Sequence, residues 1–180
     1  MADVVTLKDA VEQRGPYAVW ELMTEEEQRA AAAALWENAD RDSRMLVEVA
    51  LAKELKFRPH SVARLSTDRV VGRLVRLAEE IPENVLFQFL FHHHMAERRD
   101  LLSDFLDAVG LPHKDGVLDL PDDFEAPDET AVARAARDLV ADRGHAALVY
   151  LATLKVADSD FWSAVDAVLE TYSEDGASLG

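Results

Sequence analysis

The chain of 180 residues contains no cysteine, and its 35 acidic side chains outnumber 19 basic ones, which gives a formal net charge of −16. The absence of cysteine excludes thiol catalysis, disulfide bonds and cysteine-ligated metal centres, and it suits a reducing cytoplasm. The length fits one domain or two small ones, and the net charge disfavours indiscriminate binding of the whole molecule to nucleic acid or to an anionic membrane.

Two features of the chain bear on its location. Residues 1–14 contain no apolar stretch after a basic start, so the sequence shows no secretory signal. The most apolar run, residues 85–91, is interrupted by Gln88 and is much shorter than the ~20 residues that a membrane-spanning helix needs. We therefore expect a cytoplasmic protein without a membrane partner.

Helix signals dominate the first third of the chain. Thr24 followed by three glutamates has the pattern of a capping box, in which Thr24 and Glu27 each bond the other's backbone amide. This pattern predicts a helix over residues 25–38, and a second helix is expected over residues 42–55. The apolar stripe expected on the second helix comprises Leu46, Val49, Ala50 and Leu55.

The middle of the chain predicts a short segment and two further helices. Arg58 precedes a proline and is pushed out of the helical region, so the second helix ends at or before it. Ser66 is a suitable N-cap for a helix that ends before Pro82. Residues 83–109 then predict one long helix, straight or bent, that closes at Gly110. One expected apolar side comprises Phe87, Leu90, Phe91, Met95, Leu101, Leu102, Phe105, Leu106 and Val109. Val85, Leu86 and Phe89 lie on the other side, so the first half is apolar nearly all round and is expected in the core.

The last third begins with a long loop. Residues 111–127 hold three prolines, a glycine and several acids, and they predict a loop or a linker. Helices are then expected over residues 129–143 and 145–157 and from about Ser159, and the tail from Ser173 is expected to fray. No run of residues predicts a sheet.

These elements predict an all-α protein, a multi-helix bundle or a set of stacked helical hairpins, with about seven to nine helices and no significant sheet. We expect an N-terminal helical bundle at 1–110, the acidic, proline-rich loop or linker at 111–127, and a C-terminal three-helix part at 128–175. The two helical parts are expected to pack together as one domain.

Three consecutive histidines, His92, His93 and His94, are the most conspicuous polar group. Consecutive positions on a helix fan out over about 200°, so the three rings cannot converge on one ion, and no known metal-binding spacing is present. We expect neither a metal nor a cofactor. His94 and Arg98 fall within the apolar stripe, and together with Glu97 they are the best candidates for binding a small ligand. The alternative is that His94 and Arg98 are buried groups satisfied by neighbouring helices.

A basic segment lies between residues 53 and 76, where seven cationic side chains face only Glu54 and Asp68. The cationic residues are Lys53, Lys56, Arg58, Arg64, Arg69, Arg73 and Arg76. A solvated surface that docks against the acidic C-terminal third is one interpretation of this segment.

The other interpretation comes from residues 51–65, which read LAKELKFRPHSVARL and resemble the core of a bacterial helix-turn-helix. The apolar positions that match are Ala52, Leu55, Phe57, Val62 and Leu65. The resemblance implies DNA binding by residues that face the major groove, namely Arg58, His60, Ser61 and Arg64. The family usually has glycine at the turn, where this chain has Lys56, and a positive φ would strain that residue.

Three classes of function remain open. The chain has no phosphate-binding loop, dinucleotide fingerprint or nucleophile elbow, so we expect a non-enzymatic interaction or regulatory module that binds a protein partner or a small ligand. An apolar face among the terminal helices would allow dimerisation through two antiparallel helices across a two-fold axis. The alternatives are a DNA-binding regulator that uses residues 51–65 and a helical enzyme or metal-binding protein built on residues 92–98.

Overall fold

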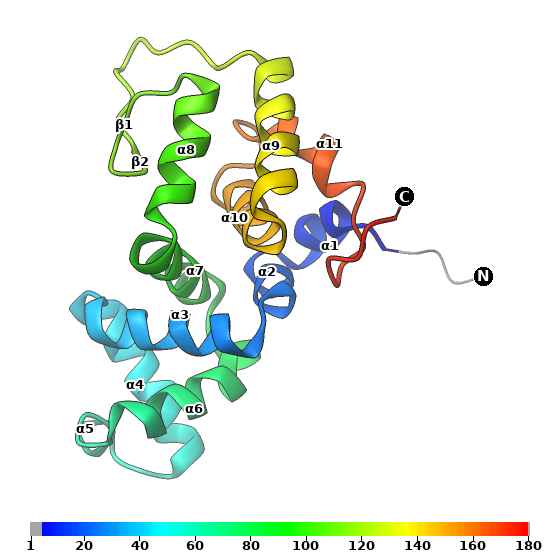
Figure 1. Ribbon diagram of the computed structural model, residues 1–180. Coiled ribbons are helices and arrows are strands. Elements are labelled where there is room, and N and C mark those ends of the chain that lie inside the picture. The colour runs from blue at the N-terminus through cyan, green and yellow to red at the C-terminus, as the bar shows by residue number, and fades with distance from the viewer. Residues whose placement is uncertain (1–4, 180) are drawn as a thin grey trace. The chain divides into compact units, whose positions relative to one another are not determined.

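The computed structural model describes residues 5–179, and about 70% of the protein is helical. Within that range the chain forms eleven α-helices and one small hairpin (Figure 1), so the predicted all-α class is confirmed. The predicted number of helices is too low, because residues 7–22 form two helices, residues 59–62 form a one-turn helix and the helix expected over 83–109 is divided. No helix within residues 5–179 has both the length and the apolar character that crossing a membrane requires.

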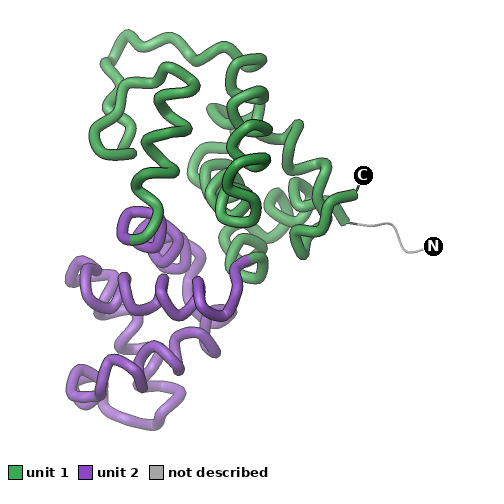
Figure 2. The backbone as a smooth tube through the Cα atoms, viewed as in Figure 1, with its two compact units in different colours: residues 1–22, 97–180 green, residues 23–96 purple. Residues whose placement is uncertain are grey.

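The chain divides into two compact units, which Figure 2 shows in different colours. Unit 1 combines Met1–Leu22 with Glu97–Gly180, and unit 2 is the intervening segment Met23–Ala96. The 111–127 segment, which the sequence marks as a break, lies inside unit 1. The division into helical parts at 1–110 and 128–175 stays a prediction.

In unit 2, α3 (Glu25–Asn38) has the bounds that the sequence predicts. The Thr24 hydroxyl accepts a hydrogen bond from the Glu27 amide at 3.2 Å, and the Glu27 carboxylate accepts one from the Thr24 amide at 2.9 Å, so the capping box is confirmed. Helix α3 packs against α6 (Thr67–Leu77), which follows the expected N-cap residue Ser66.

Helix α4 (Arg41–Leu55) begins one residue earlier than predicted, because Asp40 is its N-cap. The Asp40 carboxylate accepts hydrogen bonds from the amides of Asp42 and Ser43, both at 2.9 Å. Helix α4 packs against α6 and against the one-turn helix α5 (Pro59–Val62).

Two helices replace the single one predicted over 83–109. After the 3-10 turn η1 (Ala78–Glu80), α7 (Glu83–Glu97) ends at Arg98, whose φ of −134° and ψ of 22° lie outside the helical region. Helix α8 (Arg99–Val109) follows and closes at Gly110 with a φ of 77°, as predicted. The first half is buried as expected through Val85, Leu86, Phe89 and Leu90. Phe91, which the sequence also places on the apolar side, is instead 41% exposed.

Helix α10 (His145–Ala157) forms the centre of unit 1, and its residues 147–153 are all buried. The helices that pack against it are α1 (Leu7–Arg14), α2 (Pro16–Leu22), α9 (Glu129–Arg143) and α11 (Asp166–Leu169), and the 3-10 turn η2 (Ser163–Val165) also contacts it. Aromatic rings complete this core. The Phe105 ring lies edge-on to Tyr150 at 5.7 Å and 5.8 Å from the Trp162 ring.

The predicted 111–127 loop contains a hairpin of strands β1 (His113–Lys114) and β2 (Val117–Leu118). Asp115 and Gly116 connect the strands with positive φ values of 51° and 81°, as a two-residue hairpin turn requires. A β-carbon on Gly116 would lie 2.7 Å from the Leu102 β-carbon, so glycine also permits the turn to approach α8.

The C-terminal segment does not fray, contrary to expectation. The Leu7 amide donates to the Tyr172 carbonyl at 2.8 Å, and the Glu174 amide donates to the Val5 carbonyl at 3.1 Å. Two isolated antiparallel β-bridges pair Thr6 with Ser173 and Tyr172 with Ser178. The tail is therefore held by main-chain bonds to a segment more than 160 residues away, and local sequence cannot reveal such bonds.

Candidate interaction surface

The structure places the three residues predicted to bind a ligand in different surroundings. His94 is buried in α7 and belongs to unit 2, whereas Glu97 is exposed and Arg98 is half-buried, and both belong to unit 1. A ligand-binding role for this set stays a prediction. No group of three or more metal-ligating side chains gathers among the described residues.

The predicted helix-turn-helix has the expected turn but a short second helix. Lys56 adopts the left-handed conformation, with a φ of 55° and a ψ of 35°, at the position where the family has glycine. Arg58, His60 and Arg64 are exposed, and Ser61 is half-buried. The segment that would enter the major groove comprises a single helical turn, Pro59–Val62.

The apolar positions of that resemblance are only partly buried. Ala52 and Val62 are buried, and Leu55 and Leu65 are half-buried. Phe57, which also matches an apolar position of that family, is 46% exposed.

Helix α4 exposes three large apolar side chains, two of which, Leu46 and Val49, belong to the apolar stripe predicted from the sequence. Met45, Leu46 and Val49 are 54%, 42% and 51% exposed, whereas the opposite side of the helix is buried through Val47 and Leu51. The predicted stripe containing Leu46 and Val49 is therefore wrong. We call the exposed residues Met45, Leu46 and Val49 the α4 face.

Charged residues stand at both ends of the α4 face. Asp42, Leu46, Val49 and Lys53 occupy positions i, i+4, i+7 and i+11, so at 100° per residue they lie on one stripe about 60° wide. Asp42 and Lys53 are both exposed, and neither forms an ion pair with another of the residues from 5 to 179. The stripe thus reads acid, apolar, apolar, base in the direction of the helix.

Contacts at both ends hold α4 in place. The Arg44 guanidinium lies 4.3 Å from the centre of the Trp36 ring, and its Nε is 3.3 Å from Glu48 Oε1. Toward the C-terminal end, Arg73 Nη1 of α6 lies 3.4 Å from Glu54 Oε1. The contacts to Trp36 and Arg73 thus connect α4 to α3 and α6.

Two titratable groups near the start of α4 are perturbed. Hydrogen bonds from the Ser43 amide and hydroxyl lower the pKa of Asp40. Burial lowers the pKa of His92 in α7, and the negative charge of Asp40 opposes that shift by favouring the imidazolium. Asp40 and His92 are therefore electrostatically coupled.

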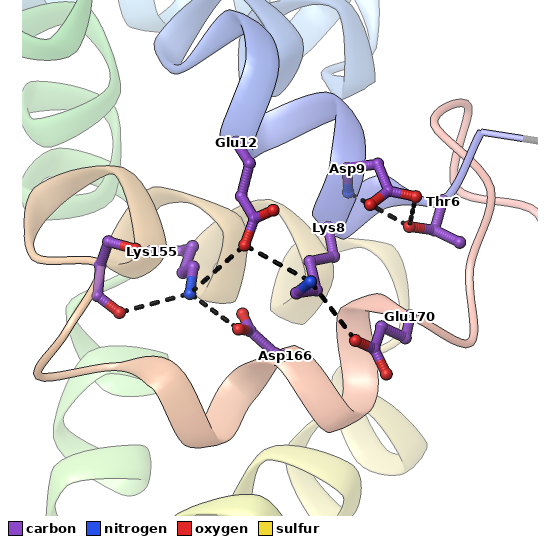
Figure 3. Close-up of polar contacts among 8 residues, drawn as sticks. Thr6, Lys8, Asp9, Glu12, Lys155, Asp166 and Glu170 are labelled. Carbon is purple, nitrogen blue, oxygen red and sulfur yellow. Dashed lines mark hydrogen bonds and ion pairs between the residues drawn. The ribbon is translucent and has the colours of Figure 1, made fainter.

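Sequence reasoning also missed an ion-pair network in unit 1, which Figure 3 shows in close-up. Lys155 of α10 is almost completely buried, and its Nζ lies 2.8 Å from Asp166 Oδ2 and 4.0 Å from Glu12 Oε1 (Figure 3). Lys8 Nζ lies 3.5 Å from Glu12 Oε1 and also 3.5 Å from Glu170 Oε1. The available signal was a single lysine inside the apolar run LVYLATLKV. The network links α1, α10 and α11 and fits a structural role.

The α4 face thus combines three exposed apolar side chains with an acidic residue at one end and a basic residue at the other. Comparison of the chain with models of protein families, with curated proteins and with solved structures found no match.

Proposed function

We propose that the protein is a non-enzymatic helical interaction module whose contact surface is the α4 face. One observation carries the proposal: three neighbouring large apolar side chains of one helix are each between 42% and 54% exposed. Single exposed apolar residues are ordinary, but a contiguous group with a charged rim is typical of a protein-binding surface. Burial of these side chains against a partner removes apolar area from water and supplies the affinity.

Site-specific crosslinking tests this surface. A photoreactive phenylalanine analogue at Val49 is expected to give a discrete crosslinked protein in cells that produce the chain. The same analogue at Glu79, an exposed position of unit 2 outside α4, serves as the control. The captured species is then purified, and its binding to the purified chain should be lost in Val49→Glu. Equal crosslinking from Val49 and Glu79 would contradict the proposal.

DNA binding through residues 51–65 is a second candidate function. It is supported by the positive φ of Lys56 and by the exposure of Arg58, His60 and Arg64. The chain should retain duplex DNA at low salt, and its affinity should fall steeply as the salt concentration rises. The reason is that basic side chains bound to the phosphates displace counterions, and added salt opposes this release.

A matched pair of variants tests this alternative. Arg58→Glu with Arg64→Glu should abolish retention, whereas Arg134→Glu with Arg137→Glu makes the same change of charge on exposed positions of α9 and should preserve it. No retention of DNA by the unsubstituted chain at low salt would exclude this function.

A further inference from the structure

We propose that the partner of the α4 face is a second copy of this chain, docked antiparallel across a two-fold axis that passes between residues 47 and 48. The inference rests on the proposed function, because it names the occupant of the same surface. It is carried by the order of charges along the exposed stripe of α4, which is complementary to its own reverse.

The stripe becomes self-complementary when two copies run in opposite directions. An axis between residues 47 and 48 places residue i opposite residue 95 − i of the other copy. Asp42 then faces the partner's Lys53, and Leu46 faces the partner's Val49. Symmetry repeats both pairs, so one contact contains two opposite-charge pairs that flank a central apolar cluster.

Other arrangements of two copies lack this match. A parallel pairing sets Asp42 opposite Asp42 and Lys53 opposite Lys53, and like charges across a contact are unfavourable. A shift of the antiparallel pairing by one helical turn separates both charge pairs. The order acid, apolar, apolar, base therefore specifies direction and register together.

The dimensions of the stripe set the strength of association. Lys53 follows Asp42 by eleven positions, which corresponds to about 16.5 Å along the helix at 1.5 Å per residue. We expect a contact of one short helix pair to bury less than the ~1,000 Å² typical of a stable interface. The dimer should therefore be weak and should form and dissociate with concentration.

Charge reversal combined with sedimentation equilibrium tests the pairing. The unsubstituted chain should show a concentration-dependent monomer–dimer equilibrium. Asp42→Lys alone and Lys53→Asp alone each place like charges opposite one another at both ends of the contact, so each variant should dimerise about tenfold more weakly. An equimolar mixture of the two variants should form heterodimers, because every pair then again joins a lysine to an aspartate. The double variant should recover homodimers for the same reason.

A folding check, a control variant and a disulfide crosslinking experiment complete the test. Circular dichroism establishes that each variant is folded, and Arg134→Asp with Asp138→Lys, a charge exchange on exposed positions of α9, should leave the equilibrium unchanged. Because the chain has no cysteine, a mixture of Leu46→Cys and Val49→Cys contains only the introduced thiols. Oxidation should join the two variants to each other more readily than either to itself.

The possible results separate this inference from the function on which it rests. A strictly monomeric chain, or a dimer that ignores Val49→Glu and both charge reversals, overturns the self-pairing. If Val49 then crosslinks a different protein, the interaction module stands with another occupant. A monomeric chain without any crosslink specific to Val49 overturns both proposals.

Discussion

Replacing Lys155 by methionine is expected to destabilise the protein by ~3 kcal/mol. The Lys155 side chain is 4% exposed, and its Nζ lies 2.8 Å from Asp166 Oδ2 and 3.3 Å from the Ser159 carbonyl oxygen. Removing one member of a buried ion pair typically costs ~3–5 kcal/mol, because the remaining charge stays buried without compensation. The lower end applies here, since the Asp166 side chain retains 19% exposure and Lys8 still interacts with it electrostatically.

Urea unfolding, followed by circular dichroism, measures the loss in free energy of unfolding. Two further variants show whether the loss comes from the buried ion pair. Lys155→Met with Asp166→Leu removes both charges and should recover most of the loss, because replacing a whole buried pair by apolar groups is often neutral. Arg143→Met removes contacts to three aspartates, but those groups are largely exposed, so its cost should stay below ~1 kcal/mol. A cost for Lys155→Met no larger than that for Arg143→Met, or a double variant no more stable than the single one, would refute the reasoning.

Three other predictions concern single residues. Gly116→Ala should destabilise by ~1–3 kcal/mol in the same urea assay, because it combines a φ of 81° with a 2.7 Å approach to the Leu102 β-carbon. Burial raises the pKa of Tyr150 above its ordinary value of 10.0. The neutral phenol therefore contributes its full stabilisation below pH 10.0, and this stabilisation is lost as the pH rises toward the pKa of the folded state. The difference in absorbance at 295 nm between the unsubstituted chain and Tyr150→Phe should therefore show this tyrosine ionising only as the protein unfolds in alkali. The His92 imidazole should titrate below 6.5 by NMR, so its protonation costs stability as the pH falls. Asp40→Asn, which preserves the N-cap, should lower the pKa of His92 further.

The sequence predicts those elements whose deciding interactions are local. Thr24 and Glu27 lie three residues apart, and their reciprocal bonds define the start of α3 without help from the rest of the fold. Gly110 likewise ends α8 through its own positive φ. The hairpin turn at Asp115–Gly116 belongs to the same group, because Asp-Gly is a strong two-residue turn signal.

The side of a helix that faces the core is a different kind of problem. Helix α4 carries apolar residues on opposite sides, with Leu46 and Val49 on one and Val47 and Leu51 on the other. Periodicity alone does not choose between them, and the choice depends on where α5 and α6 pack. The same ambiguity applies to α7. Because the helix is interrupted at Arg98, the side of α7 that is buried does not continue in register into the buried side of α8.

The distribution of charge explains why a contact through unit 2 suits this chain. Unit 1 has a formal net charge of −14, whereas unit 2, with ten basic and twelve acidic side chains, has only −2. Two copies that met through unit 1 would bring strongly like-charged surfaces together. The proposed contact through α4 would instead join two units of low net charge and would add two opposite-charge pairs. The charge of unit 1 then repels further copies, so a net charge of −16 is compatible with one specific contact while it opposes indiscriminate association.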